Sequence, residues 1–215
     1  LGSSGIRADR TTNEMALIRR VQRGDQAAFA ELLEVYEKPV YNLCLRMTGN
    51  PEDAADMTQE AFLKVWRGIE QYKFESSFST WVYRLTSNVC IDFLRGKKRR
   101  QTVSLTVDED QDGAAELELP DAAPLPEDQV LHRETESEIV RAMNRLDDEF
   151  RMILTLRILE DLSYEEIAQV MDLKVGTVKS RLARARVKLK KILTETGNKG
   201  KHPASKQTER GVKPQ

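Results

Sequence analysis

Apolar side chains recur at intervals of three or four residues along most of this chain, and alternating runs of β-branched residues are scarce. This periodicity places apolar residues on one face of successive α-helices. We therefore predict an all-α protein. The pattern predicts helices over about residues 13–24, 26–48, 51–68, 81–100, 132–146, 150–159, 163–171 and 175–191.

Glycine and proline residues divide the N-terminal half into segments. Gly24 and Gly49 end the first two predicted helices. Pro39 lies inside the second and predicts a kink or a break there. Pro51 opens the third at a position where proline is tolerated. The side chains expected on the inward face of this third helix are Ala54, Ala55, Phe62, Val65, Trp66 and Ile69.

The segment 162–191 has the pattern of a helix–turn–helix. Ser163 followed by Glu166 forms a capping box, which begins the first of two short helices. Residues 172–174 break the pattern, and Asp172 or a neighbour must accept the bend in place of a glycine. The second helix carries an apolar stripe, and no acidic residue lies between Asp172 and Glu195. Its inward positions are Val178, Leu182, Ala185 and Leu189.

In a helix–turn–helix, the second helix enters the major groove of DNA and its N-terminal residues contact base edges. A basic amphipathic helix alone would be read as a solvated surface that binds nothing in particular. The capped first helix, the short turn and the acid-free second helix together favour DNA binding. The residues predicted to contact DNA are Lys174, Thr177, Lys179, Ser180, Arg181 and Arg184.

A second candidate nucleic-acid surface combines the loop 70–80 with the helix predicted from Trp81. Rings, amides and cations gathered in this way suit single-stranded nucleic acid, because bases stack on rings while cations follow the backbone. The alternative is that Phe74, Phe78 and Trp81 belong to the core. On the helix, the side chains expected to be exposed are Tyr83, Arg84, Asn88, Asp92 and Arg95.

An acidic stripe follows the first turns of the helix 51–68. Its members are Glu52, Asp53, Asp56, Gln59 and Glu60. Three interpretations stay open: a solvated face that favours the helix dipole, a metal or acid/base site, and a docking face for a basic partner. No histidine lies nearby, which weighs against metal.

Composition adds constraints. Of 215 residues, 32% are charged and 40% apolar, and the formal net charge is −1. This sum hides separate blocks, since residues 102–131 hold nine carboxylates and no lysine or arginine, whereas 196–215 are mostly basic. Cys44 and Cys90 are expected to be reduced core residues of a cytosolic protein. The sequence indicates no signal peptide, membrane span, cofactor, catalytic residue or metal site, and the two histidines lack partners at ligand spacing.

Three motifs in series resemble one family. The runs DAADMTQEAFLKVW, FSTWVYRLTSNVCIDFLR and LSYEEIAQVMDLKVGTVKSRLARAR are similar to those of extracytoplasmic-function sigma factors of bacterial RNA polymerase. The resemblance extends from about Asn13 to Leu193. It implies recruitment of polymerase to promoters and opening of the DNA strands, without bond-making chemistry.

The resemblance also assigns roles to residues. The segment implied to dock on the coiled coil of the largest polymerase subunit contains Asp53, Asp56, Gln59, Glu60, Phe62, Leu63 and Trp66. The loop and helix implied to hold the −10 element contain Lys73, Phe74, Glu75, Ser76, Ser77, Asn88, Asp92, Arg95, Lys98 and Arg99. Lys179, Ser180 and Arg184 match the family's −35 contacts. Ala183 replaces the larger residue of some relatives, which leaves contacts there open.

Together these features predict five segments. They are a disordered tail, in part an expression scar (1–12), an N-terminal sigma domain (13–101), an acidic flexible linker (102–131), a C-terminal sigma domain with the helix–turn–helix (132–195) and a basic disordered tail (196–215). The expected partners are core RNA polymerase, through the coiled coil and the flap, promoter DNA and an anti-sigma factor. The expected location is the cytoplasm.

Two other classes stay open on the residues alone. A stand-alone helix–turn–helix regulator would use its N-terminal half for sensing or dimerisation and would bind an operator without polymerase. A helical metal-dependent enzyme would use the carboxylates between Glu52 and Glu60, and would need further ligands on a neighbouring helix.

Overall fold

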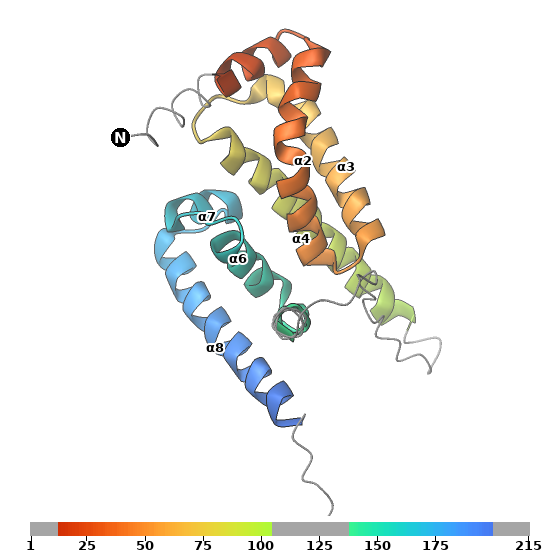
Figure 1. The fold of residues 1–215 in the computed structure, drawn as a ribbon, viewed down its shortest axis with the longest axis vertical. Coiled ribbons are helices and arrows are strands. Elements are labelled where there is room, and N and C mark those ends of the chain that lie inside the picture. Colours follow the sequence, from red (N-terminus) through yellow and green to blue (C-terminus); the bar gives the residue numbers. More distant parts are fainter. Residues whose placement is uncertain (1–12, 105–137, 200–215) are drawn as a thin grey trace, which may run out of the picture.

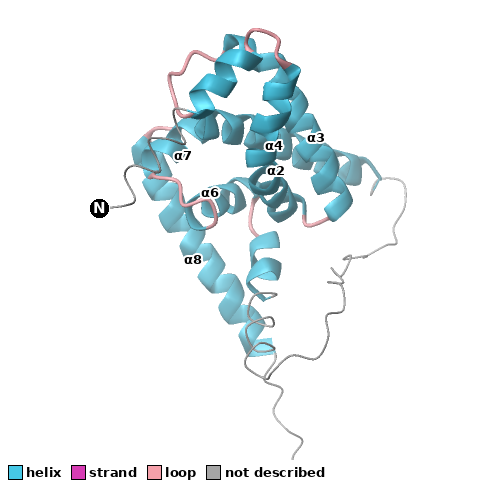
Figure 2. Ribbon diagram, turned by 45° about the horizontal axis from the view of Figure 1, so that its top comes forward, coloured by secondary structure: helices cyan, strands magenta, loops and turns pink. Residues whose placement is uncertain are grey.

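The computed structural model describes residues 13–104 and 138–199, and within these two ranges every regular element is a helix (Figures 1 and 2). The all-α prediction is confirmed. The predicted tail 1–12 lies outside the described residues, as do nearly all of the predicted acidic linker and residues 200–215 of the predicted tail 196–215. Residues 196–199, predicted to be disordered, belong to helix α8 (Val175–Lys199) instead.

The N-terminal unit, defined as residues 13–104, begins with a helix at 13–21. It continues with α2 (Gln26–Thr48), α3 (Pro51–Gly68), the short 3₁₀ helix η1 (Ile69–Gln71) and α4 (Phe78–Ser104). The side chain of Asp25 caps α2, and Asn50 caps α3 ahead of Pro51. Gly49, with φ of 68°, ends α2 in the left-handed conformation that glycine adopts without strain. These signals place the ends of α2 and α3 where the sequence predicted them.

Pro39 does not break the helix, since α2 is continuous from Gln26 to Thr48. Proline removes the hydrogen bond that the carbonyl of Val35 would otherwise accept. Val35 is 61% exposed, so this part of α2 faces solvent and water can reach the freed carbonyl. The predicted break is therefore wrong, and a kink at Pro39 stays a prediction.

The inward face of α3 differs in part from the prediction. Ala54, Val65 and Ile69 are buried, as expected, but Ala55 is exposed and Trp66 retains 37% of its surface. Ala61 takes the buried place instead. Trp66 lies beside Phe29 of α2, with ring centroids 4.7 Å apart. It therefore covers the edge of the core and leaves one side open to solvent.

Helix α4 begins at Phe78, three residues earlier than predicted. The hydroxyl of Ser77 accepts a hydrogen bond from the backbone N–H of Thr80 at 3.1 Å, which satisfies one of the free donors of the first turn. Phe78 and Trp81 are buried, so both belong to the core. Tyr83, expected to be exposed, is also buried.

The C-terminal unit, defined as residues 138–199, contains a helix at 138–144 followed by α6 (Asp148–Ile158), α7 (Tyr164–Met171) and α8 (Val175–Lys199). Ile139 is 43% exposed, and Ala142 and Leu146 are the buried residues of this segment. Helix α8 continues past residue 195, the predicted end of the domain.

The two units pack against each other, with α4 against α7 and α6 against both α2 and α4 (Figure 1). Buried residues of both units form one hydrophobic cluster. Arg151 of α6 crosses this boundary: its guanidinium donates to the carbonyl of Met47 near the end of α2 at 2.6 Å. It also donates to Asn144 at 3.0 Å. Burial lowers the pKa of Arg151, which Asp148 opposes in part.

Further polar contacts join the units through α4. The hydroxyl of Tyr83 donates to the carboxylate of Glu160, and burial together with this carboxylate raises the pKa of Tyr83. Lys98 donates to Asp148 at 2.8 Å. Despite this packing, Lys179, Ser180 and Arg184 on α8 are exposed. The contact between the units therefore leaves the predicted DNA-reading face open.

Candidate nucleic-acid interface

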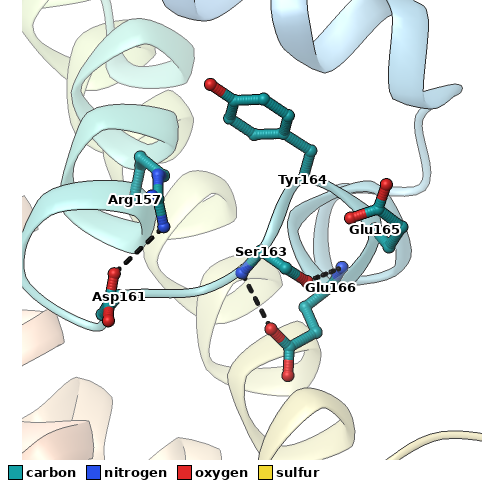
Figure 3. A pocket seen from close by; sticks show the side chains of 6 residues that line it. All are labelled: Arg157, Asp161, Ser163, Tyr164, Glu165 and Glu166. Atoms are coloured by element: carbon teal, nitrogen blue, oxygen red, sulfur yellow. Dashed lines mark hydrogen bonds and ion pairs between the residues drawn. The ribbon is translucent and has the colours of Figure 1, made fainter.

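The helix–turn–helix predicted from the sequence is present in α7 and α8. Figure 3 shows both arms of the capping box: Ser163 accepts from the N–H of Glu166 at 3.2 Å, and its own N–H donates to the Glu166 carboxylate at 2.8 Å. Asp172 takes the bend, with φ of 51°, and its N–H donates back to Ala168. Thr177 then donates to the carbonyl of Lys174 at 2.8 Å, which begins α8.

Replacing Ser163 with alanine removes one arm of this capping box. We expect Ser163→Ala to lower the free energy of unfolding by about 1 kcal/mol, because an amide at the start of α7 loses its partner. Chemical denaturation measures this loss. Glu165→Gln, an exposed change in the same turn, serves as the control and should leave the free energy of unfolding within about 0.5 kcal/mol of the parent. Equal stability of Ser163→Ala and the parent would contradict the assignment.

The predicted DNA contacts on α8 differ in accessibility. Lys174, Lys179, Ser180 and Arg184 are exposed, and Thr177 is half-buried. Arg181 is also half-buried, and its guanidinium donates to Glu149 of α6 at 2.6 Å. Lys179 lies 5.9 Å from the ring centroid of Tyr164. The first turns of α8 thus present two cations and a hydroxyl to solvent, supported from behind by α6 and α7.

One cation further along α8, Lys188, is tied to α6. Lys188 pairs with Asp147 and lies 5.0 Å from the ring centroid of Phe150. Both partners are at the start of α6. These contacts hold the middle of α8 against the start of α6. The outer side of the first turns of α8 stays exposed to solvent.

The loop predicted to hold the −10 element follows η1. Lys73, Phe74, Glu75 and Ser77 are exposed, and Ser76 is half-buried. The hydroxyl of Tyr72 donates to the carbonyl of Ser76 at 2.6 Å and so closes the loop. Phe74 has φ of 60°, an uncommon conformation for a bulky residue. Its ring lies 4.8 Å from that of Tyr72, which joins it to the aromatic core.

The predicted −10 residues on α4 form an exposed row. Its members are Asn88, Asp92, Arg95, Lys98 and Arg99. Arg95 pairs loosely with Asp92 at 4.0 Å, and Lys98 is the member that reaches the other unit. An open groove lies between the loop and α7. It is lined by Lys73, Glu75, Ser76 and Arg84 on one side and by Gln169 and Asp172 on the other.

The surface predicted to dock on polymerase lies on α3. Asp56, Gln59, Leu63 and Trp66 are exposed, and Glu60 and Phe62 are half-buried. Asp53 is also half-buried and pairs with Lys97 of α4 at 3.0 Å. This face therefore combines apolar side chains with accessible carboxylates. Asp53 differs from the other carboxylates because it already forms an ion pair with Lys97.

No group of three or more side chains able to hold a metal occurs among the described residues. The hollow in Figure 3, of about 450 Å³, is lined by Arg157, Asp161, Ser163, Tyr164, Glu165 and Glu166. Arg157 pairs with Asp161, and Ser163 with Glu166, so these groups satisfy one another. The described helices also contain none long and apolar enough to cross a membrane.

Cys44 and Cys90 are free thiols buried between α2 and α4, which confirms their prediction as core residues. The Cys90 thiol donates to the sulfur of Cys44 at 3.7 Å. This hydrogen bond lowers the pKa of Cys44 and raises that of Cys90, and burial adds to the rise at Cys90.

Three residues that organise these surfaces carry no signal in the sequence. Gln22 donates to two backbone carbonyls before the loop, Arg151 bridges the units, and Glu160 receives Tyr83. Each makes its contact with residues far away in the chain, and periodicity carries no information on such pairs.

Comparison with known proteins identifies two family models in this chain. Sigma-70 region 2 matches residues 32–100, and Sigma-70, region 4 matches residues 136–189. These matches cover the loop with α4 and the helix–turn–helix, respectively.

Curated relatives match over most of their length. The ECF RNA polymerase sigma factor SigW of Bacillus subtilis is 35% identical over 178 residues, which cover 83% of this chain and 95% of the relative. The ECF RNA polymerase sigma-E factor of Escherichia coli K12 is 37% identical over 177 residues, or 80% and 90% of the two chains. Among solved structures, CnrH in complex with the cytosolic domain of CnrY shares the fold, with a TM-score of 0.61, 20% identity, and 85% and 98% coverage. The chain therefore belongs to the extracytoplasmic-function sigma factors, which direct bacterial RNA polymerase to specific promoters.

Proposed function

We propose that this sigma factor divides promoter recognition between its two units. The C-terminal unit reads duplex DNA at −35, and the N-terminal unit holds core polymerase and traps unpaired bases at −10. The observation that carries this proposal is the formed helix–turn–helix with Lys179, Ser180 and Arg184 exposed at the start of an α8 segment without acidic residues until Glu195.

At −35, Lys179, Ser180 and Arg184 are assigned to base edges and adjacent phosphates. Lysine and arginine donate to guanine in the major groove, and a good bidentate contact contributes about 1–3 kcal/mol of discrimination. Lys174 and Thr177, at the turn, are assigned to the backbone, where contacts fix register. Arg181 must exchange Glu149 for a phosphate, so its contribution to affinity is expected to be smaller.

At −10, the loop 73–77 and the exposed row on α4 are assigned to the melted strand. Extruding a base costs a few kcal/mol, and stacking on a ring returns about 1–3 kcal/mol. Phe74 is 39% exposed and offers such a ring. Asn88, Arg95 and Arg99 are assigned to the adjacent bases and phosphates, and Lys98 joins them when its pairing with Asp148 opens.

The exposed face of α3 is assigned to the coiled coil of the largest polymerase subunit. Leu63 and Trp66 supply apolar contact area, and Asp56, Gln59 and Glu60 surround them with acceptors for basic side chains. Phe62 and Asp53 support this face from the half-buried side. The C-terminal unit contacts the flap, so polymerase links two weak DNA sites into one strong one.

An anti-sigma factor is the proposed inhibitor. Two solved structures that share this fold contain a protein partner: CnrH is bound to the cytosolic domain of CnrY, and the sigma factor RpoE of Bartonella quintana is bound to the anti-sigma factor NepR. The proposed place of action is the cytoplasm, where polymerase and the chromosome are. The chain is proposed to catalyse no reaction and to need no cofactor.

Transcription with purified components tests this function. Core polymerase with the chain, supplied with genomic DNA of its own organism, should start transcripts at a small set of positions that share −35 and −10 sequences. The free chain should bind the same promoters only weakly, because neither unit alone has enough contacts. Unspecific initiation on all of this DNA would refute the proposal. The promoter mapped in this way is the probe for the experiments below.

A further inference from the structure

The side chain of Gln22, just after the first helix, forms hydrogen bonds with the backbone that leads into the −10 loop. Its amide nitrogen donates to the carbonyl of Ile69 at 2.9 Å and to that of Tyr72 at 3.0 Å. An amide NH₂ has two protons, so both are used. The two carbonyls belong to η1 and to the residue that ends it. One side chain therefore sets the direction of the backbone immediately before Lys73.

The loop that follows is held in an uncommon conformation. Phe74 has φ of 60°, which for a bulky residue costs energy and persists where the surroundings hold it. The Tyr72 ring contacts Phe74 on one side, and the guanidinium of Arg19 lies 5.9 Å from its ring centroid. Arg19 and Gln22 are one turn apart, on the helix 13–21 and just after it. Arg19 of the first helix therefore contacts the loop itself, and Gln22, just after this helix, contacts the backbone that leads into the loop.

We propose that Gln22 is a positioning residue for capture of the melted −10 strand. By fixing the Ile69 and Tyr72 carbonyls, it keeps Phe74 and the neighbouring loop atoms in place before DNA arrives. Ordering a loop in advance removes that entropic cost from binding. This inference rests on the proposed role of the loop 73–77 and adds a residue outside the loop.

The core of the first helix does not depend on Gln22. Leu17, Ile18 and Val21 anchor the helix and are buried, whereas Gln22 is half-buried at its edge. Removing the amide while keeping the length of the side chain should therefore loosen the loop without unfolding the unit. The effect of Gln22 on the position of the loop can therefore be measured apart from any effect on the stability of the unit.

The test replaces Gln22 with methionine, which has a similar length and no donor. We expect Gln22→Met to bind a single-stranded oligonucleotide of the mapped −10 non-template strand about tenfold more weakly, as the loss of intramolecular hydrogen bonds predicts. Affinity for core polymerase should stay within about twofold of the parent. Gln26→Met, the same change at an exposed site, is the matched control and should bind the oligonucleotide normally.

A pre-melted promoter provides the second readout, measured with holoenzyme. If Gln22 acts in strand capture during opening, Gln22→Met should initiate poorly on duplex promoter, and a template with an unpaired −10 region should restore most of the activity. Equal loss on both templates, or lost polymerase affinity, would show a general structural role and overturn the inference. Unchanged oligonucleotide binding would overturn it as well.

Phe74→Ala, assayed in parallel, separates this inference from the proposed function of the loop. If Phe74→Ala weakens binding to the oligonucleotide and Gln22→Met does not, the role of Gln22 is refuted and the loop assignment stands. If neither change has an effect, the loop assignment itself is refuted, and the inference falls with it.

Discussion

Tying the two units together across the contact of Tyr83 and Glu160 should abolish promoter-specific transcription. Tyr83 lies on α4 of the N-terminal unit, and its hydroxyl donates to Glu160 of the C-terminal unit. In this arrangement, the −10 loop and the turn before α8 line the same groove. Promoter elements at −35 and −10 are about 25 base pairs apart, or about 85 Å of B-form DNA. We therefore expect the units to separate before both elements are bound.

The tie uses Tyr83→Cys and Glu160→Cys joined by a short bis-maleimide, with mass spectrometry to verify the link. Cys44 and Cys90 are fully buried, whereas Tyr83 retains 8% of its surface and Glu160 is half-buried, so the introduced thiols are the more accessible ones. We expect the linked protein to lose about 100-fold or more of its specific transcription, equivalent to about 2.7 kcal/mol or more. Each single variant treated with the same reagent is the control. Linked protein as active as these controls would show that the closed arrangement suffices for initiation.

Loss of Arg184 should weaken promoter binding by a factor of about 5 to 150, the effect of about 1–3 kcal/mol from one major-groove contact. Arg184 is exposed on α8, and its Nε–H makes a long bond of 3.4 Å to the carbonyl of Ser180 within the same helix. No folded-state contact of comparable strength is lost in Arg184→Ala, so stability should stay close to that of the parent. The measurement is the affinity of holoenzyme for the mapped promoter.

Lys190→Ala is the matched control, because Lys190 is exposed on the same helix beyond its first four turns. This change should cost a small, sequence-independent part of the affinity, as expected for a distant phosphate contact. If Arg184→Ala and Lys190→Ala lowered the promoter affinity by the same small factor, α8 would act as a uniform basic surface, and its first turns would not recognise bases.

The fold was predictable from the sequence where local signals determine it. Ser163 with Glu166, and Pro51 after Asn50, satisfy helix ends by contacts within four residues, and these ends are correct. The break expected at Pro39 is wrong, because this part of α2 faces solvent and water can reach the carbonyl that loses its hydrogen bond. The start of α4 at Phe78 was missed because Ser77 acts as a cap in a run of several serines.

The contacts between the units were not predictable. Tyr83 is buried because Glu160 lies against it, and Arg151 is buried because the end of α2 offers a carbonyl. Nothing in the periodicity around an aromatic or an arginine distinguishes an exposed position from one covered by another unit. The same holds for Gln22, whose partners follow 47 and 50 residues later.

The predicted site residues share a simpler property, which is their accessibility to solvent. Most of the predicted −35, −10 and polymerase-binding side chains are exposed or half-buried in the structure. Polar residues on the outer face of an amphipathic helix follow directly from its period. The sequence does not show which of these side chains already form ion pairs within the protein, as Arg181 does with Glu149 and Asp53 with Lys97.

The division of labour between the two units is tested most directly by crossing protein variants with promoter variants. Holoenzymes carrying Arg184→Ala or Phe74→Ala are assayed on the mapped promoter with each base pair of −35 and −10 substituted in turn. The account predicts that Arg184→Ala becomes insensitive to at least one −35 substitution while it still responds to every −10 change, and that Phe74→Ala shows the reverse. If both variants lost sensitivity at the same promoter positions, separate reading of the two elements by these two units would be contradicted.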